Sequence, residues 1–175
     1  MSIVQLTKWE LKHVNRSNSK NESRHNRNSM LEWQDPGRAL EKTMKKLQHL
    51  SQTYMNSAAR YIDPSSAQIC IILSERALEY MLKALYMKAN HHILPPHALS
   101  LHDLVQLTAK DSIPDLDTVM LLYSIHFLAS CQDVSFIRHT HVSHLTRLLT
   151  QVDDVLTRLS ASITSNPLER YRSIL

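Results

Sequence analysis

Hydrophobic side chains recur every three or four residues along most of the chain, the spacing of helices that bury one face. In the first such stretch, residues 38–61, the inward face comprises Leu40, Met44, Leu47, Ser51, Tyr54, Ala58 and Tyr61. The last stretch repeats the spacing at Val142, Leu145, Leu149, Val152, Leu156, Leu159 and Ile163. Both patterns predict long helices that pack against neighbouring helices.

Residues 65–89 carry apolar side chains on almost every side, which predicts the central and most buried helix. Asp63 and Pro64 precede it, an acceptor for free N–H groups followed by a residue suited to the first helical position. The charged residues of this helix form one stripe, where the glutamates are expected to pair with the neighbouring cations: Glu75, Arg76, Glu79 and Lys83.

Proline-containing segments divide the rest of the chain into shorter helices. Pro95–Pro96 cannot continue a helix, so residues 90–100 are expected to form a loop. Ser100 is a candidate cap for a short helix over residues 101–109, and a longer helix is expected over residues 115–130. The expected fold class is all-α: an antiparallel up-and-down four-helix bundle with one short extra helix.

The composition supports a helical fold and excludes several nucleotide-binding folds. Gly37 is the only glycine, whereas β-hairpins and glycine-rich phosphate loops need glycine at fixed positions. Cys70 lies in an apolar run and is expected to be a buried free thiol, so a reducing, cytoplasmic location is predicted. We find no signal peptide and no stretch that could span a bilayer, so no membrane partner is expected.

The net charge of +4 at pH 7 is unevenly distributed. Residues 1–38 hold seven Lys/Arg against four acidic residues, a net charge of +3, so the rest of the chain contributes only +1. Binding of nucleic acid must therefore depend on a local site, because the folded part is close to neutral.

The distribution of charged and apolar residues along the chain suggests three segments. Residues 15–29 have no large apolar side chain and are expected to form a disordered linker, unless translation begins at Met30. We expect an N-terminal extension over residues 1–37, a helical bundle over residues 38–166 and a tail over residues 167–175.

A cluster of ionisable side chains precedes the last helix, in Arg138-His139-x-His141-x-x-His144. Arginine presents a planar donor fork that matches phosphate, and histidine transfers protons near neutral pH. These groups meet the minimal needs of RNA cleavage by its own 2′-hydroxyl without a metal. At about 100° per residue, His144 points away from the apolar face, so packing does not explain it. The alternative is that these are ordinary polar residues at a helix start.

A second group of histidines lies in the loop region and comprises His91, His92, His97 and His102. Histidines can bind zinc or copper, but neither a cysteine nor a regular ligand spacing accompanies them. No metal site and no cofactor is therefore expected.

The segment from Tyr54 to Asn90, followed by LSLHDLVQLT, resembles the HEPN domain family. The matching positions are Ala77, Glu79, Leu82, Lys83, Ala84 and Leu85, then His102, Asp103 and Leu104. The resemblance covers about residues 38–163 and implies an antiparallel four-helix bundle, usually a homodimer. Many members of the family are metal-independent ribonucleases, often toxins, and others sit beside a small nucleotidyltransferase or lack catalytic chemistry.

By this resemblance, Arg138, His139 and His144 match the catalytic arginine–histidine motif at the start of the family's last helix. Arg138 would hold phosphate, His144 would move the proton and His139 would assist, whereas His141 is too close to Arg138 for that role. The resemblance implies a homodimeric endoribonuclease that acts on RNA and could be held by an antitoxin. The alternative is a non-catalytic module that binds a nucleotide or a protein, such as a nucleotidyltransferase.

Overall fold

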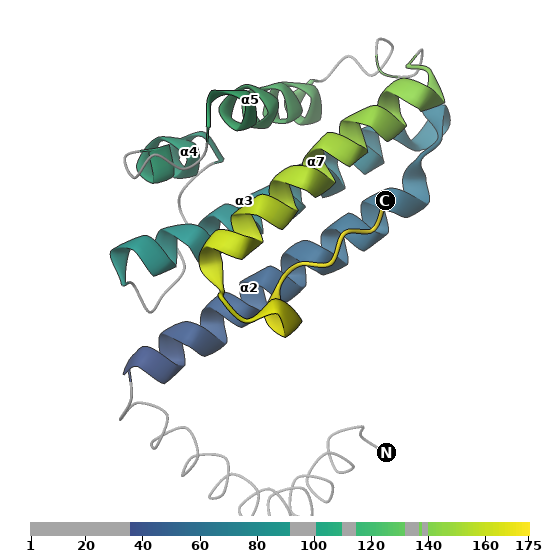
Figure 1. Cartoon of the computed structure of the whole chain (residues 1–175). Coiled ribbons are helices and arrows are strands. Elements are labelled where there is room, and N and C mark those ends of the chain that lie inside the picture. Colours follow the sequence, from purple (N-terminus) through teal and green to yellow (C-terminus); the bar gives the residue numbers. More distant parts are fainter. Residues whose placement is uncertain (1–35, 92–100, 110–114, 132–136, 138–139) are drawn as a thin grey trace, which may run out of the picture. The chain divides into compact units, whose positions relative to one another are not determined.

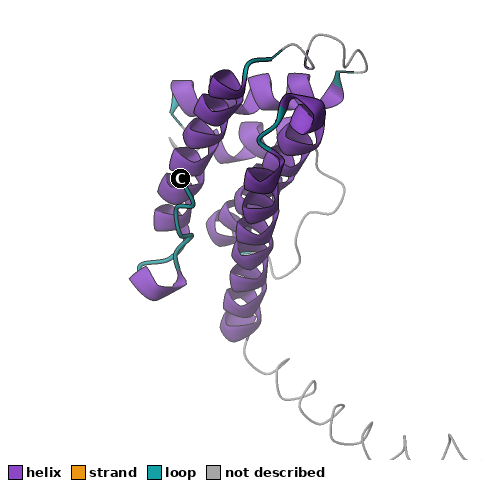
Figure 2. Cartoon of the chain, turned by 90° about the vertical axis from the view of Figure 1, so that its right-hand side faces the viewer, coloured by secondary structure: helices purple, strands orange, loops and turns teal. Residues whose placement is uncertain are grey.

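The structure is a computed structural model that describes residues 36–91, 101–109, 115–131, 137 and 140–175. All regular secondary structure in these residues is helical, so the all-α prediction is confirmed (Figures 1 and 2). The α-helices are α2 (Pro36–Ala58), α3 (Ala67–Asn90), α4 (Leu101–Ala109), α5 (Leu116–Ser130) and α7 (Val142–Ile163). Three short 3₁₀ helices are η2 (Ala59–Tyr61), η3 (Pro64–Ser66) and η4 (Pro167–Glu169).

The chain divides into two units, residues 1–39 and residues 40–175, and the second unit contains the features discussed below. Residues 1–35 of the expected N-terminal extension, the Pro95–Pro96 loop and Ser100 lie outside the described residues, and Pro36 and Gly37 belong to α2.

The start of α3 follows the predicted capping chemistry. The Asp63 carboxylate accepts a hydrogen bond from the Ser65 N–H (2.8 Å) and contacts the Ser65 hydroxyl. Pro64 then begins η3, which leads directly into α3. These hydrogen bonds lower the pKa of Asp63, because they stabilise its charged form.

α3 contributes more buried side chains than any other described helix, as its apolar pattern predicted. They include Cys70, Ile71, Ala77, Leu78, Met81, Leu82, Ala84, Leu85 and Met87. Three of the described helices pack against α3, namely α4, α5 and the buried face of α7. α3 ends at Asn90, and the next residue, His91, has a left-handed backbone conformation (φ 53°). Residues in this conformation commonly close helices, so the backbone of this histidine terminates α3.

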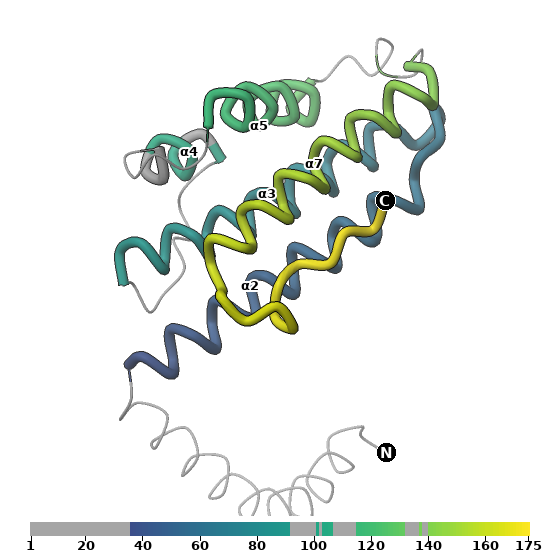
Figure 3. The backbone as a smooth tube through the Cα atoms, in the orientation of Figure 1, coloured from purple at the N-terminus to yellow at the C-terminus, as the bar shows by residue number. Residues whose placement is uncertain are grey.

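The course of the helices can be followed along the backbone in Figure 3. Two side-chain hydrogen bonds identify which helix ends meet. The Lys88 Nζ atom donates to the Ser162 carbonyl (2.6 Å), which joins the C-terminal ends of α3 and α7. The Gln68 Nε2 atom donates to the Ala129 carbonyl (3.1 Å), which joins the start of α3 to the end of α5. α3 and α7 therefore run in the same direction, and α5 runs antiparallel to both.

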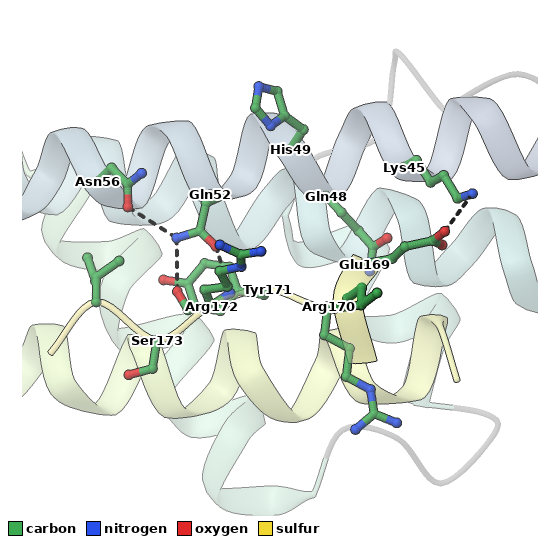
Figure 4. A pocket seen from close by; sticks show the side chains of 12 residues that line it. Lys45, Gln48, His49, Gln52, Asn56, Glu169, Arg170, Tyr171, Arg172 and Ser173 are labelled. Atoms are coloured by element: carbon green, nitrogen blue, oxygen red, sulfur yellow. Dashed lines mark hydrogen bonds and ion pairs between the residues drawn. The ribbon is translucent and has the colours of Figure 1, made fainter. Parts of the chain in front are cut away.

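The segment over residues 170–174, called the strap below, lies against α2 and α7 as a non-helical chain (Figure 1). Gln52 holds its backbone: the Arg172 N–H donates to Gln52 Oε1 (2.8 Å), and Gln52 Nε2 donates to the Arg172 carbonyl (3.0 Å; Figure 4). Tyr171 is buried, and its N–H donates to the Ser160 hydroxyl oxygen (2.7 Å). The expected tail is thus packed on the helices.

Asp153 is the second anchor of the strap. It is 2% exposed, and its carboxylate accepts hydrogen bonds from the Tyr171 hydroxyl (2.6 Å), the Ser173 hydroxyl (2.5 Å) and the Ile174 N–H (3.2 Å). Burial raises the pKa of Tyr171, and its hydrogen bond to Asp153 raises it further. The strap therefore covers the Asp153 carboxylate and also supplies the hydrogen-bond donors that a buried carboxylate needs.

The two cysteines are free and differ in burial: Cys70 is buried and Cys131 is partly exposed. Burial raises the pKa of Cys70 to about 12, so its thiolate at pH 8 is on the order of a thousandfold scarcer than that of an unperturbed thiol. We expect Ellman's reagent to modify one thiol per native chain at pH 8, and both thiols after unfolding. Cys131→Ser should abolish the native reaction; a native reaction of two thiols would contradict this burial.

Candidate functional site

α7 begins at Val142, and His141 caps its N-terminus. The His141 Nδ1 atom accepts a hydrogen bond from the Ser143 N–H (3.3 Å) and lies 2.8 Å from the Ser143 hydroxyl oxygen. A nitrogen that accepts from an N–H carries no proton, so the neutral ring carries its proton on Nε2. His141 is therefore the N-cap of α7, because its side chain accepts a hydrogen bond from a backbone N–H of the first turn. Ser, Thr, Asp or Asn usually occupies this position.

His144 lies in the first turn of α7, where its backbone N–H donates to the His141 carbonyl (2.9 Å). The two rings lie edge to face, with 6.4 Å between their centroids. The side chain of His144 is exposed and the neighbouring Leu145 is buried, so His144 points away from the apolar face, as predicted. Within the described part of the chain, the His144 ring has no hydrogen-bond or ion-pair partner.

Arg138 and His139 lie outside the described residues, so the structure brings together only the two histidines of α7. Their neighbours in sequence are placed: Ile137 is buried, and the Thr140 N–H donates to the Ile137 carbonyl (3.0 Å). This hydrogen bond joins the described residues that precede and follow Arg138 and His139 in sequence.

The stripe of charges on α3 contains one pairing that the sequence did not predict. The Glu75 Oε1 atom lies 2.6 Å from His126 Nδ1 on α5, so the expected partnership of Glu75 with Arg76 or Lys83 is wrong. A single histidine among the apolar residues of the helix from Leu116 to Ser130 was the available signal. The sequence did not predict the pairing of Glu75 with His126, because the partner of Glu75 on α5 depends on how α3 and α5 pack.

Glu79 instead accepts both cations of the stripe. Its carboxylate lies 2.6 Å from Arg76 Nη1 and 2.6 Å from Lys83 Nζ. Burial alone would raise the pKa of Glu79, but the hydrogen bonds from Lys83 and Arg76 outweigh it and lower the pKa. One carboxylate thus faces two cations, a net charge of +1, and the three side chains link two successive turns of the central helix, so we assign the triad to structure.

Metal binding in the histidine-rich loop lies largely outside the described residues, which exclude His92 and His97. In the remainder that the structure does describe, no three His, Cys, Asp or Glu side chains gather closely enough to hold a metal ion. In the same residues, no helix combines the length and apolar character needed to cross a membrane.

No protein-family model, no curated protein and no solved structure matches the chain.

Proposed function

We propose that the chain is a HEPN-type, metal-independent endoribonuclease whose site lies at the start of α7. The observation that carries the proposal is the exposed ring of His144, which has no hydrogen-bond or ion-pair partner among the described residues. Arg138 and His139 follow the buried Ile137 and precede the cap of the same helix, so they lie within a few residues of this ring in sequence. The resemblance of residues 38–163 to the family adds to this local argument.

The fold that accompanies this proposal is an up-and-down bundle of α2, α3, α5 and α7, with α4 as the extra short helix. The hydrogen bonds between helix ends support it, because they give α3 and α7 one direction and α5 the opposite one. We include the homodimer in the proposal, since a second copy could supply an acid where the first supplies a base.

The proposed reaction uses no group outside the protein and its RNA. The 2′-oxygen attacks the adjacent phosphorus while His144 accepts the proton of the 2′-hydroxyl, and the bond from phosphorus to the 5′-oxygen breaks. A second imidazole, from His139 or from the other copy, protonates the leaving 5′-oxygen. Arg138 holds the phosphate oxygens and stabilises the charge that develops on them. The products would carry a 2′,3′-cyclic phosphate and a 5′-hydroxyl.

Removal of His144 tests this proposal directly. We expect His144→Ala to lower the rate of RNA cleavage in EDTA by about a hundredfold or more, because proton transfer by a positioned side chain contributes 10²–10⁴-fold. Arg138→Ala should have an effect of similar size. The circular dichroism spectrum should not change, because His144 is exposed.

Three matched variants serve as controls. His49→Ala removes an exposed histidine from α2, and Arg147→Ala removes an exposed arginine one turn after His144; both should cleave at the wild-type rate. His141→Asn should also remain active, because asparagine can replace the cap. Full activity of both His144→Ala and Arg138→Ala would refute the proposal.

A further inference from the structure

α5 carries apolar side chains around most of its circumference, but the described helices cover only part of them. Thr118, Leu122 and Ile125 are buried against the core. Three large apolar side chains remain exposed: Leu116 (75%), Met120 (60%) and Phe127 (71%). At 100° per residue these three positions fall within about 40° of one another, so they form a single stripe along the helix. A contiguous exposed stripe of this kind commonly marks an interaction site.

A groove runs beside this stripe, between α5 and the second half of α7. Its volume is about 480 Å³. Leu121 and Val155 provide its apolar side chains, and its polar lining comprises Asp117, Ser124, Gln151, Asp154 and Arg158. The exposed Met120 belongs to both the groove and the stripe, so the two form one continuous surface, called the α5–α7 surface below.

The charges of the α5–α7 surface are unequally satisfied. Arg158 is already held: its Nη1 atom lies 2.7 Å from Asp115 Oδ2, and its Nη2 atom donates to Thr118 Oγ1 (3.0 Å). Asp117 and Asp154, by contrast, are exposed and have no hydrogen-bond or ion-pair partner among the described residues. The surface therefore offers two unpaired carboxylates beside apolar side chains and has no unpaired cation of its own.

We propose that the α5–α7 surface binds an amphipathic helix of a partner protein. Apolar side chains of that helix would cover Met120, Phe127 and the groove, and lysine or arginine side chains would pair with Asp117 and Asp154. Two packed helices leave a groove that accepts the ridge of a third helix. From Leu116 to Phe127 the stripe spans twelve residues, or eleven steps of 1.5 Å, about 16 Å, which corresponds to three turns of a bound helix.

A second copy of this chain fits the α5–α7 surface less well than a basic helix does. α5 contains no lysine or arginine, so pairing α5 with its copy would leave the carboxylates unmatched. The one further cation on this face of α7, Arg147, lies seven residues before Asp154, about 10 Å along the helix. The proposal is also independent of RNA cleavage, because Asp154 lies ten residues beyond His144.

The probe for this surface is a fluorescein-labelled designed helix of 15 residues, with leucine along one face and lysine along its borders. We expect it to bind the full chain, and Phe127→Ala to weaken binding about tenfold, as loss of a central aromatic contact does. The double variant Asp117→Asn/Asp154→Asn should also weaken binding and reduce its dependence on salt. Leu168→Ala, which removes a side chain that is 81% exposed on η4, should bind as wild type does.

Three results would overturn the proposal. One is no binding of the lysine helix at 100-fold excess over micromolar protein, and another is equal binding of a matched helix in which glutamate replaces lysine. The third is a dimer of the chain alone in sedimentation equilibrium that Phe127→Ala dissociates, because the occupant would then be a second copy. Cleavage of RNA should be the same in wild type and Phe127→Ala, which separates this test from that of the proposed function.

Discussion

Asp153→Ala is expected to lower the free energy of unfolding by about 3 kcal/mol and to release the strap from α2 and α7. The buried carboxylate accepts from the Tyr171 hydroxyl, the Ser173 hydroxyl and the Ile174 N–H. Its removal leaves the phenol of Tyr171 buried without an acceptor, and each unsatisfied buried group costs about 1–3 kcal/mol. The strap can avoid this cost only by leaving its position against α2 and α7.

Chemical denaturation measures the stability, and limited trypsin digestion measures the release. Arg170 and Arg172 are the trypsin sites of the strap, and the backbone of Arg172 is held by Gln52 in the native protein. We expect faster cleavage there in Asp153→Ala. The neighbouring Asp154 is exposed and has no partner in the described chain, so Asp154→Ala is the matched control and should change stability by less than about 0.5 kcal/mol. Equal effects of the two substitutions would contradict the anchoring role of Asp153.

Leu78→Ala should have an effect of similar or greater size, about 3 kcal/mol. Leu78 is 0% exposed and lies near the middle of α3, in the core shared by that helix and its neighbours. Truncation removes apolar contacts and leaves a cavity that surrounding helices can fill only in part, and both terms destabilise the folded state. Thermal and urea unfolding monitored by circular dichroism would report the loss.

Leu168→Ala is the control with the same change of side chain, since Leu168 is 81% exposed. We expect it to shift stability by less than about 0.5 kcal/mol. A loss in Leu78→Ala no greater than that of the control would mean that α3 is not the centre of the core.

The helices could be predicted from the sequence because their boundaries depend on local chemistry. Spacings of three and four residues placed α7, and the acceptor at Asp63 with the following proline placed the start of α3. The orientation of His144 followed from the same periodicity, because the buried positions of α7 fix every other position on the helix.

Features that depend on packing between distant residues could not be predicted in this way. The pairing of Glu75 with His126 requires the relative placement of α3 and α5. The strap requires that Gln52 and Asp153, 101 residues apart in sequence, meet the same five-residue segment. The burial of Asp153 was not predicted for a related reason. The other buried residues of α7 are mostly apolar, so nothing local distinguishes this aspartate from an exposed one.

The candidate site was predictable only in part. The sequence pointed to an arginine and histidines before the last helix, and the structure adds that His141 is the cap, whereas the His144 ring is exposed and has no hydrogen-bond partner in the described part of the chain. The division of labour between these two histidines depends on where α7 begins, and a boundary uncertain by one or two residues exchanges a cap for an exposed position.

The two hydrogen bonds between Gln52 and the strap determine which amino acids can occupy position 172. Both hydrogen bonds engage the main chain of Arg172, so the guanidinium contributes nothing to them. Any residue with a backbone N–H can donate to the side-chain oxygen of Gln52, and only proline lacks this donor. Position 172 is therefore open to substitution by design or by drift, whereas Tyr171 and Ser173 on either side are restricted by the carboxylate to which their hydroxyls donate.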